Sequence, residues 1–362
     1  MREDELYGRV MAQYVPNDVH SFAVGYEHSY ETFGLDTGLS DQRTRGQRLN
    51  FINEPWNTNT ASVLGEYRVK MAEPLTTILS GRLDDHTYSH LLVSPRISVL
   101  LNVTDVDLLK FNIGQSVRKP GDEELRAQFV ANGTIAAEEV IRGSEIRWER
   151  YQTEHLMLAS SVFHQNHEVV GFSGSLNRSD LLGTFESWGF ELEGVYDMGA
   201  NYFTVSHGYV DLLHAHLVDP NLIQAISAMP YGFGSDFANW SNNVTKFALA
   251  RNVSDAVNLS TSMRVYWGFP GADDLAAFNN TLPTISGAIA QADPGYTKAS
   301  RANVYWDLGY NHQWSKHISW RADLYNVLGW FDIDLNKRNY INRVTEYRPE
   351  AAAVGLSGTI SY

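Results

Sequence analysis

The sequence predicts an all-β fold, a membrane-spanning antiparallel up-and-down β-barrel. Three observations point to it. Apolar and polar residues alternate with a period of two along much of the chain. The alternating segments run to roughly 10–13 residues, against about 5–6 for strands of soluble proteins. Short and long connections also follow one another in alternation, as they do between the strands of a membrane barrel.

The alternation of residue types is clearest near the end of the chain. Ile318, Trp320, Ala322 and Leu324 alternate with Ser319, Arg321, Asp323 and Tyr325, and Val257, Leu259, Thr261, Met263, Val265 and Trp267 alternate with Asn258, Ser260, Ser262, Arg264 and Tyr266. A helix would place both classes on every face, so these segments are predicted strands. We expect Trp320, Leu324, Val257 and Leu259 to face outward, and Arg321, Asp323 and Arg264 to face inward.

A soluble β-sandwich also alternates, but the content and length of these segments favour a membrane barrel. The polar rows carry Arg, Lys, Asp and Glu in the middle of predicted strands. A tilted strand needs about 9–11 residues to cross a bilayer. A closed barrel of such strands leaves no backbone group unpaired in lipid.

The connections between the predicted strands fall into two classes. Tight turns are predicted at 15–18, 72–74, 103–105, 152–154, 198–200, 253–255 and 313–315, and long links at 33–59, 119–138, 171–186, 213–243, 269–301 and 333–350, with one short exception at 87–89. The pattern gives about 15 strands and places the C-terminus on the side of the tight turns, as in membrane barrels. No internal repeat beyond the strand pattern and no low-complexity linker marks a second domain, so 1–362 is predicted to be one barrel unit.

Composition excludes several other classes. The chain has 362 residues, a formal net charge of −14 and no cysteine, so it has no disulfide framework and no thiolate metal site. The acidic balance argues against nucleic acid as a partner. No run of about 18 apolar residues exists to form a membrane-spanning helix. The opening MREDELYGRV lacks the features of a signal peptide, so we expect an exported protein to have its true N-terminus further upstream.

Several segments carry a more specific pattern. Ser94, Pro95 and Arg96 open one predicted strand, and the next ends in Arg118 and Pro120, with Glu124 and Leu125 beyond. Asn132 and Glu138 follow, and then Glu145 and Glu149 on another alternating strand. Asn326 lies in Leu324-Tyr325-Asn326-Val327-Leu328, and Tyr362 is a terminal aromatic residue.

In order and spacing, over roughly residues 60–362, these segments resemble TonB-dependent outer-membrane receptors. The family pattern reads S-P-R, then Y-G-x-A-F-R-x-P, N-P-x-L-x-P-E, S-x-E-x-G-x-E and V-x-N-L-x-D, before a closing strand that ends in an aromatic residue. Val117 stands where the family has Phe, and neither proline of the N-P-x-L-x-P-E box is present.

The resemblance implies a plugged barrel of about 22 strands. It also implies energy-coupled uptake of a bulky nutrient, most often a ferric siderophore and sometimes cobalamin, haem or a glycan. The implied partners are the TonB complex acting through a plug, the barrel-assembly machinery through the closing strand, and outer-membrane lipid with lipopolysaccharide. No plug-like segment is found, so 1–362 is predicted to be the C-terminal part of a receptor barrel.

Two rival functions belong to other classes. A passive porin would be a diffusion channel without a ligand, and the long links and the R-x-P box favour the receptor over it. An outer-membrane lipase would need a Ser–His pair on one face of a strand, whereas Ser206 and His207 are adjacent and face opposite sides. No other catalytic constellation is found, so no enzyme is predicted.

Candidate binding residues are of three kinds. Charged inward residues are expected to neutralise one another across strands more often than to bind a ligand; they are Arg68, Arg118, Arg147, Glu149, Glu191, Glu193, Arg264, Arg321 and Asp323. The histidine pairs, such as His214 and His216, lack a third ligand, so neither a metal nor a cofactor is predicted. Ligand contacts are expected in the links, with Tyr231, Phe233, Phe237 and Trp240 as candidates.

Overall fold

The computed structural model describes residues 4–33, 56–173, 178–218, 232–233, 236–237, 241–270, 302–331 and 352–361. Its strands are β1 (Asp4–Tyr14), β2 (His20–Phe33), β3 (Trp56–Ala72), β4 (Leu75–His86), β5 (Leu92–Asn102), β6 (Asp107–Arg118), β7 (Glu139–Tyr151), β8 (Leu156–Ser173), β9 (Arg178–Asp197), β10 (Asn201–Leu217), β11 (Gly232–Phe233), β12 (Asp236–Phe237), β13 (Asn243–Ser254), β14 (Val257–Trp267), β15 (Ala302–Ser315), β16 (Ile318–Tyr325) and β17 (Ala353–Ile360). The described helices are α2 (Asp122–Asn132) and the short 3-10 helix η1 (Val327–Trp330).

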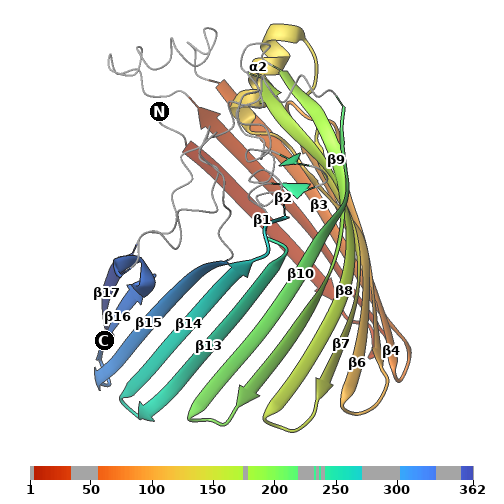
Figure 1. Ribbon diagram of the computed structural model, residues 1–362. Helices are drawn as coiled ribbons and strands as arrows, with labels where there is room; N and C mark the ends of the chain where they lie inside the picture. Colours follow the sequence, from red (N-terminus) through yellow and green to blue (C-terminus); the bar gives the residue numbers. More distant parts are fainter. Residues whose placement is uncertain are drawn as a thin grey trace.

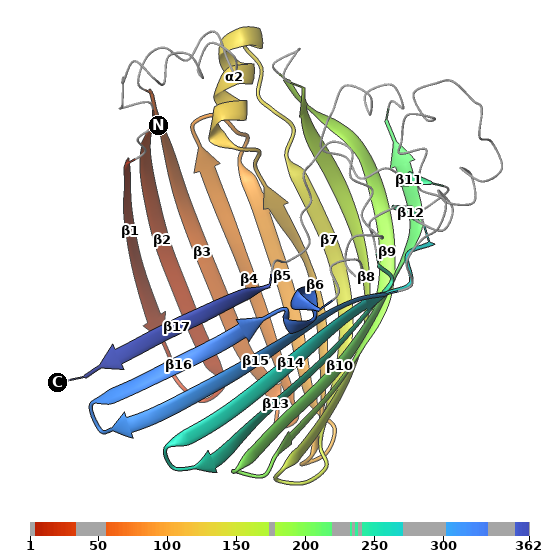
Figure 2. The same cartoon turned by 60° about the vertical axis from the view of Figure 1, so that its left-hand side comes forward.

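One large antiparallel sheet contains all of the long strands. Its 15 strands follow the order β1 to β10 and then β13 to β17, while β11 and β12 form a separate hairpin among the described residues. The sheet curves into an incomplete barrel in which the edge strands β1 and β17 are not paired with each other (Figures 1 and 2). The predicted fold of about 15 strands, each paired with its sequence neighbours, is confirmed.

The two ends of the sheet differ in their connections. Tight turns such as those between β3 and β4 or β5 and β6 gather at one end, here called the turn end. The described strand ends at which β3, β7, β13, β15 and β17 begin lie at the other end of the sheet, here called the loop end. Helix α2 lies at the loop end (Figures 1 and 2).

Strands β8 and β9 are longer than predicted. They contain 18 and 20 residues and pair from Leu156 with Tyr196 up to Ser173 with Arg178. The predicted long link over 171–186 is therefore wrong, because only 174–177 separate the two strands. A register shift between Val169 and Val170 breaks the alternation there, which removes the period that would have revealed the strand.

Helix α2 was also not predicted, since 119–138 was predicted only as a long link between strands. The helix begins after Gly121, and its first turn carries Asp122, Glu123 and Glu124, whose negative charge suits a helix N-terminus. It ends at Gly133, which adopts a left-handed φ of 66° and donates its N–H to the carbonyl of Phe129 at 2.9 Å.

The strand register assigns side chains to the two faces of the curved sheet. Arg264 is opposite Tyr305, and Asp323 is opposite Gly309, so their row continues across β14, β15 and β16 on the concave face. Leu259 is opposite Tyr310, and Leu324 is opposite Leu308, on the convex face. Trp320 and Val257 share the convex face and Arg321 the concave face, as the alternation predicts.

The convex face is largely apolar, apart from a polar band across β6 to β9 near the loop end. Arg142 on β7 donates to Gln115 on β6 at 2.9 Å and pairs with Glu168 on β8 at 2.7 Å. His164 on β8 lies 2.6 Å from Glu186 on β9. The band therefore consists of polar groups that satisfy one another across strands.

Buried side chains gather at the loop end, where α2 meets the strands. Leu125 and Ala127 of α2 are at most 1% exposed, and Phe33 and Trp56 at the ends of β2 and β3 are almost as buried. Among the described helices, none is long and apolar enough to cross a membrane.

Candidate functional site: the concave face and its loop end

The concave face encloses an open hollow of about 880 Å³ against β1 to β9. Its lining includes Arg82, Arg96, Glu66, Glu145 and Glu191. Charged side chains of both signs line the hollow, which suits a wall in contact with water or with a polar partner.

One group of charges lies on β1 to β4. Glu27 of β2 accepts from Arg9 of β1 at 3.1 Å and from Arg82 of β4 at 2.7 Å. Arg82 also pairs with Asp84 at 2.7 Å and donates to Ser62 of β3 at 2.9 Å. Two carboxylates and two guanidinium groups thus neutralise one another across four strands.

A second group lies on β6, β7 and β9. Glu149 accepts from Lys110 and from Arg147, each at 2.7 Å. Arg147 also reaches Glu193 of β9 at 2.6 Å. Towards the last strands, Arg321 pairs with Asp323 at 2.7 Å. These inward residues form cross-strand and same-strand ion pairs, as the sequence led us to expect.

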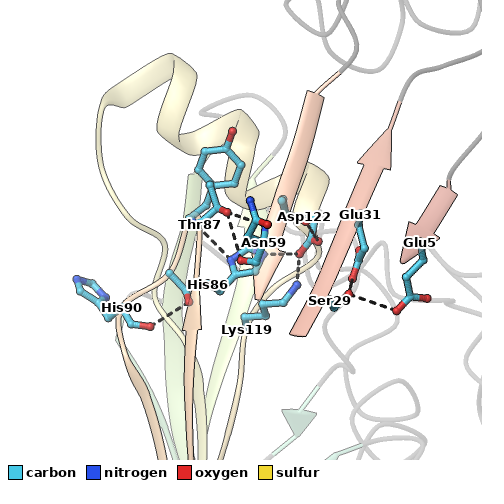
Figure 3. Close-up of polar contacts among 12 residues, drawn as sticks. Glu5, Ser29, Glu31, Asn59, His86, Thr87, His90, Lys119 and Asp122 are labelled. Atoms are coloured by element: carbon cyan, nitrogen blue, oxygen red, sulfur yellow. Dashed lines mark hydrogen bonds and ion pairs between the residues drawn. The ribbon is translucent and has the colours of Figure 1, made fainter. Parts of the chain in front are cut away.

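Helix α2 is fixed to the ends of β3 and β4 through Asp122. Its carboxylate accepts from Thr58 of β3 at 3.2 Å, pairs with Lys119, and lies 3.5 Å from Nε2 of His86 of β4 (Figure 3). Nδ1 of His86 accepts the backbone N–H of Tyr88 at 3.2 Å, which assigns the ring proton to the nitrogen that faces Asp122. Asp122 is therefore the point at which three segments meet.

The charge state of Asp122 follows from these contacts. Burial opposes its ionisation, but the hydrogen bonds of His86 and Lys119 and the positive charge of Lys119 outweigh burial and hold the pKa of Asp122 well below its ordinary value. For Glu124, two residues along the same helix, burial raises the pKa. Asp122 thus stays ionised over a wide pH range, as an anchor requires.

The opposite side of α2 contacts β9. The side-chain oxygen of Gln128 accepts the backbone N–H of Ser179 at 2.8 Å, and its amide donates to Thr134 and to the carbonyl of Ile135, both at 3.1 Å. The helix therefore connects the rim of β3 and β4 with β9 at the loop end.

An aromatic cluster accompanies these polar anchors. The rings of Phe33 and Trp56 stack with centroids 4.1 Å apart, and Tyr88 lies 5.3 Å from Phe129 of α2. The guanidinium of Arg126 lies 5.0 Å from the centre of the Trp56 ring. These residues were not predicted as a cluster, because Phe33 and Trp56 both fall within the predicted link 33–59, whereas the structure places them on β2 and β3. Gly121 with its acidic successors is a helix-start signal in the sequence.

The family-pattern residues Ser94, Pro95 and Arg96 lie on β5, Arg118 ends β6, and Pro120 follows directly. The Ser94 hydroxyl accepts the backbone N–H of Val117 at 3.3 Å. Arg118 pairs with Glu139 at 2.6 Å. In these contacts the residues connect β5, β6 and β7.

The remaining pattern residues are spread along the chain. Asn132 ends α2, and Glu138 accepts the backbone N–H of His90 at 3.1 Å. Glu145 and Glu149 lie on the concave face of β7. Asn326 follows β16 with a left-handed φ of 46°, and its N–H donates to Asp307 at 2.8 Å. Tyr362 lies outside the described residues.

The predicted ligand residues are only partly described. Phe233 lies on β11 and Phe237 on β12, and these two short strands pair antiparallel. Tyr231 and Trp240 fall outside the described residues. Within the described part of the chain, no group of three or more histidine or acidic residues is arranged to hold a metal ion.

Comparisons with known proteins agree with this architecture. Residues 3–327 match the family model described as TonB dependent receptor-like, beta-barrel. No curated protein sequence matches the chain.

The similar solved structures are distant in sequence and show the fold. The siderophore receptor PirA from Acinetobacter baumannii is 14% identical with a TM-score of 0.61, over 98% of this chain and 54% of that chain. The FrpB iron transporter from Neisseria meningitidis is 12% identical with a TM-score of 0.62, over 98% of this chain and 56% of that chain. A mutant of the ferric enterobactin receptor PfeA from Pseudomonas aeruginosa is 12% identical with a TM-score of 0.58, over 90% of this chain and 48% of that chain.

The chain spans about half the length of these receptors. The family model covers most of the chain, and its barrel description agrees with the curved antiparallel sheet and its charged concave face. On these grounds the chain belongs to the TonB-dependent receptor family and contributes β-barrel strands of that family's fold.

Proposed function

We propose that this chain forms the C-terminal barrel portion of an outer-membrane receptor that imports a ferric siderophore or a similar bulky nutrient with energy from the TonB complex. The observation that carries the proposal is the match of residues 3–327 to the receptor barrel. The siderophore receptors and the iron transporter among the similar structures support this class of ligand.

The polar concave face gives the chain a role in that import. Its ion-paired wall offers carboxylates, guanidinium groups and amides to a polar plug or to a hydrated ligand. We propose that the plug and its contact with TonB are supplied by a part of the receptor other than 1–362. In this arrangement the chain supplies the wall and the loop end, and the plug supplies the gate.

The convex face and the last strand suit the other proposed partners. Exposed apolar residues such as Leu79, Ile97 and Phe111 would contact outer-membrane lipid, with lipopolysaccharide around the loop end. The barrel-assembly machinery would recognise strand β17 and the terminal Tyr362. Ligand contacts are proposed for Tyr231, Phe233, Phe237 and Trp240, in the long segment between β10 and β13.

The decisive experiment measures iron uptake with the complete receptor. The full-length gene is placed in a strain that lacks its own siderophore receptors, and uptake of a panel of ⁵⁵Fe-siderophores is followed with and without TonB. We expect saturable uptake of at least one ferric siderophore that disappears in the strain lacking TonB. Uptake that persists without TonB and rises linearly with concentration would instead indicate a passive channel.

A further inference from the structure

Helix α2 contacts the strands of the barrel through two sets of side chains. Asp122, Arg126 and Phe129 follow one another at helical spacing and contact Thr58, Trp56 and Tyr88 at the rim of β3 and β4. Leu125 and Gln128 are also buried, and Gln128 contacts β9. The first set therefore lies against the strand ends that carry Phe33 and Trp56 on the concave side of the sheet.

Two N–H donors at this contact have no acceptor among the described residues. Nη1 of Arg126 and Nε1 of Trp56 are both buried, and neither has a hydrogen-bond partner in that part of the chain. Trp56 is only 6% exposed, and the guanidinium of Arg126 lies over its ring at 5.0 Å. Buried donors without acceptors are costly, so a pair of them at one contact requires an explanation.

The surrounding charges show why Nη1 of Arg126 lacks an acceptor there. Asp122 precedes it by one helical turn, the spacing at which Asp and Arg commonly pair. The Asp122 carboxylate is already engaged by Lys119, Thr58 and His86. Arg82 and Arg147 of the concave face, by contrast, each contact two carboxylates. Arg126 thus keeps its positive charge without a counterion from the described part of the chain.

The two donors and their surroundings fit one kind of group. A guanidinium donates along two parallel directions, which matches the two oxygens of a carboxylate. The indole N–H of Trp56 adds a third donor, and the face of the Trp56 ring makes a cation–π contact with the guanidinium. A carboxylate in contact with both residues would satisfy the orphaned donors and neutralise the charge.

We propose that Arg126 and Trp56 form a binding site for a carboxylate group of the imported ligand, at the loop end of the barrel beneath α2. The proposal rests on the import function above, because it assigns the anion to the ligand. Arg126 as a whole is partly exposed, although its Nη1 atom is buried, so an arriving anion can approach the residue from its exposed part. Binding would draw the anion between α2 and the rim and strengthen the contact of α2 with β3.

Citrate is the probe for this site, and the Trp56 indole is the reporter. The full-length receptor is folded in detergent micelles with ¹⁵N in its tryptophan indoles, and the Trp56 resonance is assigned by its disappearance in Trp56→Phe. Addition of citrate is expected to shift this resonance saturably. Arg126→Gln should weaken binding by about tenfold or more, and Arg126→Lys, which keeps the charge but not the planar fork, should weaken it less.

Arg251→Gln is the matched control. Arg251 is an exposed arginine at the turn end of β13, far along the strand from α2, so citrate binding should remain unchanged. Hydrogen exchange of the α2 amides shows whether each variant keeps its helix in place. A variant with normal α2 protection and weakened citrate binding supports a direct contact.

Three outcomes overturn the site. The first is a Trp56 resonance that does not shift through the millimolar range of citrate. The second is a shift that persists unchanged in Arg126→Gln, and the third is equal binding of inorganic phosphate, which would make the contact a general anion surface. These binding measurements do not depend on transport. If citrate fails to bind while siderophore uptake is intact, only the proposed carboxylate site is contradicted. If uptake is lost while citrate still binds, only the proposed import function is contradicted.

Discussion

At the scale of single residues, charge on the concave face is balanced within small cross-strand groups. Arg82 contacts Glu27 on β2 and Asp84 on its own strand, while Ser62 between them completes the hydrogen bonding. The carboxylate side chains of Glu27 and Asp84 are 10% and 13% exposed. Removal of the Arg82 guanidinium would leave two largely desolvated carboxylates close together, which costs more than the loss of an exposed ion pair.

We therefore expect Arg82→Gln to destabilise the barrel by about 1–2 kcal/mol, a value reduced because the Arg82 side chain is 40% exposed. Arg118→Gln is the matched control, because Arg118 pairs with Glu139 but is 78% exposed, and it should cost less than about 1 kcal/mol. Urea unfolding of the receptor in micelles, followed by tryptophan fluorescence, measures both. Equal losses in the two variants would contradict the idea that burial of the carboxylates sets the cost.

At the scale of elements, α2 is held by one polar anchor in its first turn, by another in its second half, and by an aromatic cluster. Asp122 fixes its first turn to β3 and β4, and Gln128 fixes its second half to β9. Strands that are distant along the sheet are joined at the loop end by one short helix. The stability of this connection depends on the charge of Asp122, whose partners are a lysine and a histidine.

The pH dependence of the α2 contact follows from the depressed pKa of Asp122. An acid with a lower pKa in the folded state stabilises that state above its unfolded pKa, about 3.9, and this stabilisation declines as the pH falls towards the folded pKa. We expect hydrogen exchange of the α2 amides, corrected for intrinsic rates, to be independent of Asp122 protonation between pH 6 and 8. Asp122→Asn should increase exchange by about tenfold or more across that range.

Glu124→Gln provides the control on the same helix. Burial raises the pKa of Glu124, so its ionised form is disfavoured and the neutral amide should leave α2 protection unchanged or slightly higher. If hydrogen-exchange protection of the α2 amides drops equally in Asp122→Asn and Glu124→Gln, any loss of negative charge in the first turn weakens α2. The contact of Asp122 with His86 and Lys119 would then contribute nothing beyond that charge.

At the scale of the whole molecule, the number and direction of the strands limit how the barrel can close. Neighbouring strands in the 15-stranded sheet are antiparallel, so β1 and β17 run in the same direction. Antiparallel closure therefore takes an odd number of further strands, whichever polypeptide supplies them. Each unpaired backbone N–H or C=O group that faces lipid at an edge would cost roughly several kcal/mol, so an open sheet would be unstable in a bilayer.

We expect residues 1–362, expressed alone with a signal peptide, to fail to form a heat-modifiable barrel in the outer membrane. The receptor with its proposed plug and further strands provides the positive control, and co-expression of that proposed part tests rescue. Gel mobility with and without boiling, together with protease resistance of the membrane fraction, measures assembly. A heat-modifiable, protease-resistant product from 1–362 alone would contradict the requirement for further strands.

Much of this architecture is predictable from the sequence because the period of two is a local signal. The row from Val257 to Trp267 identifies β14 and the facing of Arg264 without any knowledge of its neighbours. Helix α2 escaped prediction because distant polar contacts hold it, including those of Asp122 and Gln128, and it has no continuous apolar stripe. The contact of Arg126 with Trp56 joins residues far apart in the chain, and no local pattern reports such a pair.

The polar band on the convex face sets the depth at which the barrel would be immersed. A hydrocarbon layer cannot readily cover Arg142, Glu168, His164 and Glu186, so its outer boundary would lie on the turn-end side of this band. Strand β9 has 20 residues, about twice the 9–11 that a crossing requires. The part of β9 beyond the hydrocarbon layer would extend above the lipid on the loop-end side. It would hold α2 away from the membrane surface, in the water outside the bilayer.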